Sequence, residues 1–199
     1  MKVKILILLS VFLLYPVSVF AQWGVKGGVD FSTFFYSPSV SLGKYQTGFN
    51  IGAIYDIKLS KKMYFQPGLL FVTNGIVYEP NLLREKVNVN MYAIEVPLVM
   101  SFRPNIGDKM KLITDFGFYT RYGLLGKTKY DYTISGGDSY VIDSFDDYSR
   151  FDMGLNLGIG VSYLNYALVG TCQLGFTDVE KGVIGIKHQK NRISLIYYF

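Results

Sequence analysis

Apolar side chains alternate with small or polar ones between positions 152 and 161 of the chain. The apolar row consists of Met153, Leu155, Leu157, Ile159 and Val161, and the intervening row of Asp152, Gly154, Asn156, Gly158 and Gly160. A strict period of two predicts a β-strand whose two faces meet different surroundings. One face suits an apolar solvent, and the other suits a crowded space with little room for side chains.

The same alternation recurs in further segments along the chain. Together with residues 151–163, the expected strands cover residues 23–31, 49–58, 65–74, 92–103, 112–122, 166–175 and 192–199. No charged residue falls on the apolar row of any of these segments. Pro67 and Pro97 each remove a donor from the strand ladder, so we expect β-bulges or strand ends at these two positions.

The connections between the expected strands alternate in length. Long polar loops are expected at residues 32–45, 75–88, 124–148 and 177–190, and short turns at residues 59–62, 104–108 and 164–165. This alternation is typical of an antiparallel up-and-down meander, in which tight turns gather at one end and long loops at the other. An even number of strands then places both termini at the end with the short turns.

The first residues of the chain have the features of an export signal. Two lysines precede an apolar run over residues 5–20, and small or apolar residues follow up to Ala21. This pattern predicts a secretory signal peptide that is cut between Ala21 and Gln22. We therefore expect residues 1–21 to be removed and residues 22–199 to form a single domain.

Composition excludes several classes of protein. Without the two signal lysines, 18 basic residues stand against 15 acidic ones, an excess too small to indicate a nucleic-acid-binding protein. Cys172 is the only cysteine, so no internal disulfide can form. No segment of the mature chain approaches the roughly 20 consecutive apolar residues that a transmembrane helix needs.

The small polar row favours a membrane barrel over a soluble one. A soluble lipocalin-like barrel would hold its apolar row inside and expose a charge-rich row, whereas the polar row here is mostly Gly, Asn, Gln, Ser and Thr. Small residues suit the narrow interior of an eight-stranded barrel, and the apolar row can then face lipid. Aromatic residues, 17% of the chain, recur near the ends of the apolar rows, as in interfacial girdles. We predict an all-β, eight-stranded antiparallel transmembrane β-barrel of the outer membrane, and a periplasmic lipocalin-like binding barrel is the alternative.

Charged residues on the inward rows are nearly balanced. The basic ones are Lys26, Lys58, Arg103, Arg121 and Arg192, and the acidic ones are Asp30, Asp56, Glu95, Asp115 and Asp152. Paired charges can be accommodated in a narrow interior where isolated ones would be costly. We expect a polar network with Glu95, Arg103, Arg121, Asp115 and Asp152 at its centre, which plugs the barrel; a small conducting channel is the alternative.

The chain resembles the small outer-membrane β-barrel family that includes PorT-like proteins. The segments that carry the resemblance are Trp23–Gly28 with Phe31-Ser32, Phe65–Leu70, Ile94–Leu98, Phe116–Tyr119, Phe151–Gly154, Leu174–Thr177 and the terminal Phe199. The resemblance implies an integral outer-membrane barrel and suggests a role associated with secretion, but members of the family share no common activity. In such barrels a terminal strand that ends on aromatic residues, here Tyr197 and Phe199, resembles the signal read by the insertion machinery.

The sequence offers little that could carry catalysis. His188, the only histidine, falls in the last expected loop, where a solvated side chain is the ordinary interpretation. Asp143, Asp146 and Asp147 could gather a calcium ion, although a solvated acidic loop explains them as well. No nucleophile elbow or paired histidine base is present. We therefore expect neither enzymatic activity nor a cofactor, and we keep an outer-membrane enzyme as the rival hypothesis.

The function that the sequence favours is display from the outer membrane. Both termini are expected in the periplasm, the barrel wall contacts outer-membrane lipid, and the long loops face outwards. We expect these loops to bind a protein partner or a surface ligand, or to serve an envelope complex.

Overall fold

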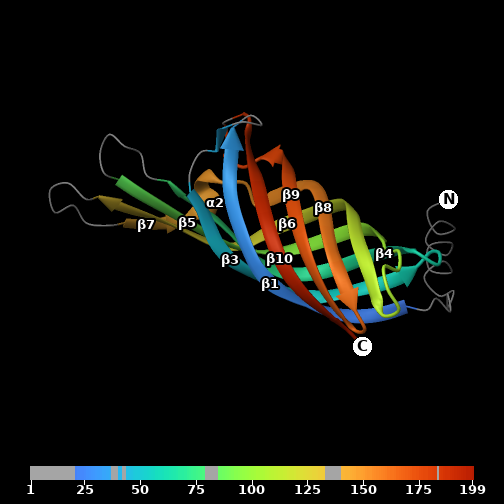
Figure 1. Cartoon of the computed structure of the whole chain (residues 1–199). Helices are drawn as coiled ribbons and strands as arrows, with labels where there is room; N and C mark the ends of the chain where they lie inside the picture. Colours follow the sequence, from blue (N-terminus) through green and yellow to red (C-terminus); the bar gives the residue numbers. More distant parts are fainter. Residues whose placement is uncertain (1–20, 37–39, 42–43, 79–84, 133–139, 183) are drawn as a thin grey trace, which may run out of the picture.

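The chain is almost entirely β-strand (Figure 1). The computed structural model describes residues 21–36, 40–41, 44–78, 85–132, 140–182 and 184–199. Its elements are β1 (Ala21–Tyr36), β2 (Val40–Ser41), β3 (Lys44–Lys58), β4 (Met63–Tyr78), β5 (Glu85–Phe102), β6 (Met110–Tyr132), β7 (Tyr140–Asp143), α2 (Ser144–Asp147), β8 (Phe151–Tyr163), β9 (Tyr166–Asp178) and β10 (Ile186–Tyr198). Among the described residues, no helix has the length and apolar character needed to cross a membrane.

The strands close into a ring of eight. Neighbouring strands follow the order β10-β9-β8-β6-β5-β4-β3-β1, and β1 pairs with β10 to complete the circle. This last pairing is antiparallel, and its register runs from Gly24 opposite Tyr198 to Tyr36 opposite Ile186. The predicted eight-stranded antiparallel barrel is confirmed, and the short turns lie where the sequence indicated. β2 and β7 are short strands outside the ring.

The apolar rows point outwards from the barrel. Val25, Ile51, Ile159 and Leu195, on four different strands, keep 45%, 54%, 65% and 55% of their surface exposed. So large an apolar surface is stable when it faces lipid rather than water. The lipocalin-like alternative is therefore wrong, because it requires these rows to fill the interior.

Aromatic rings lie on this outer surface near the end with the short turns. Trp23 packs against Tyr55 with ring centroids 4.8 Å apart, and Tyr166 against Tyr197 at 5.1 Å. These pairs match the interfacial girdle that the sequence predicted.

The long connections are shorter than the sequence indicated. Strands continue through much of the segments that were expected to be loops: β1 extends to Tyr36, β4 to Tyr78 and β6 to Tyr132, while β5 already begins at Glu85. Figure 1 shows β5, β6 and β7 projecting together beyond the ring. In β5 and β6 the prediction failed because outward residues of the extensions, such as Asn90, Lys127 and Lys129, are polar. The apolar alternation that marks a lipid-facing strand therefore stops there, while the backbone ladder continues.

Pro67 and Pro97 lie inside β4 and β5, so the expected bulges or strand ends are wrong at both positions. The pairs Pro67–Leu98 and Leu70–Glu95 belong to one unbroken register. The irregularity in the β5–β6 pairing lies opposite Tyr92 and Ala93 instead, where Leu124 is the extra residue on β6. A glycine opposite accommodates the ring, since a Cβ placed on Gly68 would lie 3.1 Å from Cγ of Pro97. The φ angle of proline is compatible with an extended strand, and each ring removes only one donor.

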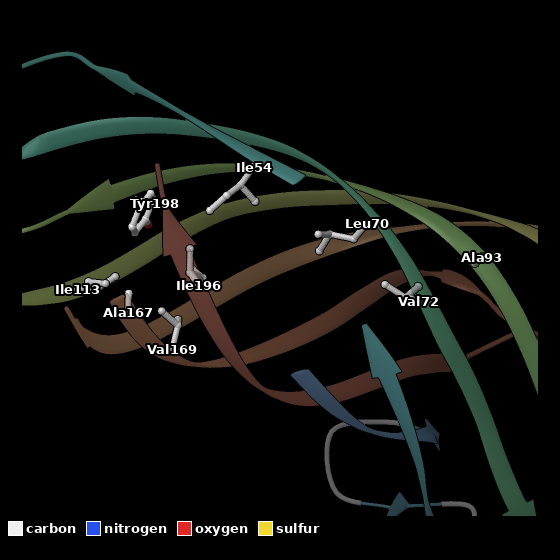
Figure 2. Close-up of a cluster of buried hydrophobic side chains, with 9 residues drawn as sticks. All are labelled: Ile54, Leu70, Val72, Ala93, Ile113, Ala167, Val169, Ile196 and Tyr198. Carbon is white, nitrogen blue, oxygen red and sulfur yellow. The ribbon is translucent and has the colours of Figure 1, made fainter. Parts of the chain in front are cut away.

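An apolar layer crosses the interior of the barrel (Figure 2). It contains Ile54, Leu70, Val72, Ala93, Ile113, Ala167, Val169, Ile196 and Tyr198, all of them buried. These residues belong to the inward rows that the sequence analysis described as small or polar. In the strand register, Ile54 is opposite Gly24 and Arg192 is opposite Asp30, so part of this layer lies nearer the short-turn end than the central charges. Its other part reaches their level, since Leu70 is opposite Glu95.

Candidate functional site

A buried carboxylate lies at the centre of the barrel interior. Glu95 on β5 accepts hydrogen bonds from Arg121 on β6 at 2.9 Å and from Arg192 on β10 at 2.7 Å. Gln173 on β9 donates to the same carboxylate at 2.9 Å. The Glu95 side chain is fully buried, so these groups replace its hydration.

Further ion pairs extend this centre across the interior. On one side, Arg192 binds Asp30 of β1 at 2.8 Å, and Lys190 lies 3.2 Å from the same carboxylate. On the other side, Arg121 donates to Asp152 of β8 at 2.9 Å. The result is a chain of alternating charges that links strands from opposite parts of the ring. We call the connected residues Lys190, Asp30, Arg192, Glu95, Arg121 and Asp152 the central network.

A second polar cluster lies towards the end of the barrel with the short turns. Arg103 forms an ion pair with Asp56, and Gln66 donates to the same carboxylate at 2.6 Å. The guanidinium of Arg103 also lies over the rings of Tyr64 and Tyr198, 4.6 Å and 5.4 Å from their centroids. Cation–π contacts of this kind hold a buried guanidinium in place.

The residues expected to form one polar network are divided between two places. Glu95, Arg121 and Asp152 are joined directly, whereas Arg103 belongs to the second cluster. Asp115 lies opposite Ser101, whose hydroxyl accepts a hydrogen bond from Nε of Arg103 at 2.8 Å, so it borders the second cluster, although among the described residues its Oδ1 atom has no hydrogen-bond partner. Strand phase showed that these side chains share the interior, but their grouping depends on the stagger between strands.

One of the expected interior charges lies outside, and another takes its place. Lys58, at the end of β3, is exposed, while Lys190 is buried beside Asp30. Lys190 is expected in a loop from the sequence, because the apolar row of this strand begins only at Ile193. A signal for the strand was nevertheless present, since His188, Lys190, Arg192 and Ser194 occupy alternate positions and all are buried.

His188 is not a solvated loop residue, so that interpretation is corrected. It lies on β10, buried, with its ring edge-on to Phe34 at a centroid distance of 4.8 Å. Its Nδ1 atom has no hydrogen-bond partner among the described residues. His188 therefore packs inside the barrel at the end with the long connections, next to the residues that close the mouth.

The segment after β7 covers the mouth of the barrel. Asp143 accepts a hydrogen bond from the backbone N–H of Phe145 at 2.8 Å and so caps the short helix α2. Phe145 is buried against the wall, where a Cβ on Gly123 would lie 2.2 Å from its ring, so only glycine leaves room for it. Asp143 therefore has a structural role. In the described part of the chain, no three His, Cys, Asp or Glu side chains are grouped so as to hold a metal ion.

The two ends of the barrel sequence are joined at the short-turn end. The backbone N–H of Phe199 donates to the carbonyl of Trp23 at 3.0 Å, and the side chain of Gln22 donates to the carbonyl of Phe199 at 3.0 Å. Tyr197 and Phe199 pack edge to face on the outer surface, 5.1 Å apart. Ala21 opens β1. The signal cleavage between Ala21 and Gln22, and the role of Tyr197 and Phe199 in assembly, remain predictions.

Comparison with known proteins shows which family and which solved structures this chain is similar to. The sequence matches the family described as outer membrane protein β-barrel domain over residues 19–180. Similar solved structures include a major outer membrane protein from Thermus thermophilus, at 13% identity and a TM-score of 0.52, and Neisserial surface protein A, at 14% and 0.49. The attachment invasion locus protein Ail of Yersinia pestis is 16% identical with a TM-score of 0.44. Each comparison covers 90% of this chain and 99% of the other. At these identities the likeness concerns the fold alone, and no curated protein matches the chain.

Proposed function

We propose, from the premise that this chain belongs to the family of outer membrane protein β-barrel domains, that it acts by display and binding at the cell surface. The chain is an outer-membrane β-barrel. The observation that carries the proposal is the filled interior: the central network, the apolar layer and the covered mouth leave the outer end of the barrel as the part available to partners. A filled eight-stranded barrel is suited to presenting its upper strands rather than to passing solutes.

The proposal includes the absence of enzymatic activity. The most concentrated set of titratable groups, the central network, consists of carboxylates already paired with arginines and lysine. A general acid or base must reach substrate, and these groups lie enclosed by the wall and the covered mouth. The charges therefore support the barrel instead of a reaction.

We expect the mature chain to begin at Gln22, with both ends of the barrel sequence in the periplasm. The support is the signal-like start and the even number of ring strands. An epitope inserted within residues 133–139 should be detected on intact cells, whereas one inserted in the turn at residues 59–62 should require permeabilised cells. N-terminal sequencing of the protein from outer membranes checks the cut. Surface detection of the turn epitope would reverse the orientation.

Deletion of Phe199 is expected to lower the amount of assembled barrel in cells. Its ring packs on Tyr197 but remains 70% exposed, so it contributes little to the folded interior, and the insertion machinery is the partner that we propose for it. Phe199→Tyr, which keeps an aromatic end, should assemble normally. Heat-modifiable mobility of membrane fractions measures assembly. Equal losses in cells and in detergent refolding would indicate a stability effect and remove the proposed recognition.

The display role is tested by exchanging the link between β6 and β7. Residues 133–139 lie outside the described part of the structure, and replacing them alone leaves β6, β7 and the Phe145 cover in place. An exchange of the whole loop expected from the sequence, residues 124–148, would remove these supports. We expect affinity capture from solubilised membranes to lose a partner with this exchange, while the barrel still inserts. The matched control is an exchange of residues 59–62 at the opposite end, which should keep the partner; equal capture by both variants would contradict the proposal.

A PorT-like, secretion-associated role is the more specific form of the proposal. Its support is the set of segments that resemble that family, such as Trp23–Gly28 and Ile94–Leu98, and both lie in strands of the ring. The capture experiment separates the two forms. Recovery of envelope secretion components supports the secretion role, and recovery of a surface ligand alone supports display without it.

A further inference from the structure

A pocket of about 330 Å³ lies at the end of the barrel that carries the long connections. One side is aliphatic and is formed by Ile76 of β4, Val87 and Val89 of β5, and Ile186 of β10. Ile76 and Val89 belong to a buried apolar cluster that also contains Phe145, and Val87 and Ile186 pack against it. The volume falls in the range of small-molecule sites, which are concave and mostly apolar.

The remaining wall combines aromatic rings with one carboxylate. Phe34, Tyr130 and Tyr148 face the pocket together with Glu180. The rings of Phe34 and Tyr148 are tilted by 55° with centroids 5.8 Å apart, so they form a corner instead of a flat stack. Burial, with the nearby Tyr130 and Glu180, raises the pKa of Tyr148 to about 12, so its phenol stays neutral at physiological pH. The acidic group of the pocket is therefore Glu180 alone.

The backbone around Glu180 is held on both sides. The N–H of Val179 donates to the carbonyl of Ile186 at 2.8 Å, and the N–H of Lys181 donates to the carbonyl of Asp147 at 2.9 Å. Glu180 itself forms an isolated bridge with Tyr148. The backbone segments that carry the carboxylate and the ring are thus braced against each other, and such preorganisation favours binding because little backbone order remains to be imposed.

The side chain of Lys181 binds the backbone of helix α2. Its Nζ atom donates to the carbonyls of Phe145 and Asp146, at 2.6 Å and 3.2 Å, and so satisfies the end of helix α2. Within the described residues, no ion pair to Glu180 occurs, so the pocket combines one unpaired carboxylate with aromatic and aliphatic side chains.

We propose that this pocket binds a small organic cation with an apolar body, of the alkylammonium class. Aromatic faces attract a cation through their quadrupole, and quaternary ammonium groups are recognised by cages of such rings. The carboxylate of Glu180 adds full charge complementarity, and the aliphatic side receives the alkyl chain. The inference deepens the proposed function by naming a ligand class for the displayed end, and as a surface site it rests on the outward orientation of that end.

Calorimetric titration of the purified mature protein in a maltoside detergent tests the binding itself. The probes are hexyltrimethylammonium, 1-hexanol and hexanoate, which share a six-carbon chain and differ in charge, each corrected for titration into detergent alone. We expect the cation to bind roughly tenfold more tightly than hexanol, and hexanoate to bind most weakly. Binding to the purified protein does not depend on which way the barrel faces in a cell, so failure here and failure of the orientation test are distinguishable.

Variants assign the effect to the pocket. Glu180→Gln should remove most of the preference for the cation, and Val87→Trp should abolish binding of all three probes by filling the aliphatic side. Tyr148→Phe keeps the ring and should keep the preference, whereas Tyr148→Leu should reduce it. Asp108→Asn, in the turn at the opposite end, is the matched loss of a carboxylate and should change nothing. Heat-modifiable mobility verifies that each variant is folded.

Three results would overturn the inference. The first is equal affinity for the cationic and anionic probes, and the second is unchanged binding in folded Val87→Trp. The third is a heat of titration for the unmodified protein that does not exceed the detergent background. If Glu180→Gln fails to fold, Tyr148→Leu and Val87→Trp still decide the matter, because each changes a different wall of the pocket.

Discussion

Replacement of Glu95 by glutamine is expected to destabilise the barrel by about 3–5 kcal/mol, the usual cost of breaking a buried ion pair. The side chain is fully buried between Arg121 and Arg192. Without its negative charge, two buried guanidinium groups lose an ion-pair partner in an interior that cannot hydrate them. Urea unfolding in detergent micelles, followed by heat-modifiable mobility and intrinsic fluorescence, measures the difference.

The matched control is Asp131→Asn at the outer end of β6. Lys129 and Asp131 form an ion pair at 2.8 Å, much like those of Glu95, but their side chains are 50% and 37% exposed. Exposed pairs contribute about 0.2–1 kcal/mol, so this substitution should barely shift the unfolding midpoint. Equal effects of the two substitutions would mean that the central network does not stabilise the barrel.

The unmodified barrel is expected to show no steady conductance in planar bilayers. Two different fillings lie along its interior: the central network, and the apolar layer that includes Leu70, Ile113 and Val169. Eight strands leave room for little beyond side chains, whereas water-filled porins have about 16–18 strands. A porin recorded in the same bilayer is the positive control, and steady, ion-selective current from the purified protein would establish a small channel instead.

The Glu95→Gln variant separates the two fillings. The apolar layer is intact in this variant. The variant should therefore show no steady conductance, even though its barrel is less stable. Current in the variant alone would show that the ion pairs are the only barrier to ions.

Strand alternation was sufficient to predict the ring and the direction of its faces. Rows such as Met153 to Val161 depend on a local period of two, and a row without charges has few stable surroundings other than lipid. The same reasoning identified Glu95, Arg121 and Asp152 as inward. The near balance of inward charges also appears in the structure, where five basic and five acidic side chains are buried among the described residues, in the strands or beside them.

Only the tertiary structure determined which buried basic side chain pairs with which acidic one. Lys190 replaces Lys58 as an interior cation, and Arg103 joins Asp56 instead of Glu95, because the stagger between strands determines which inward side chains meet across the barrel. Stagger is a property of the closed ring, so it leaves no mark on any single strand.

The strand extensions at the outer end of the barrel could not be predicted from the sequence either. Outside the lipid the outward row becomes polar, so β6 continued through residues that read as a loop, and His188 appeared solvated although it packs on Phe34. The pocket beside Glu180 depends on the same hidden strands. A period of two is visible in a sequence only while the two faces meet different solvents, and above the membrane only contacts between distant segments distinguish one face from the other.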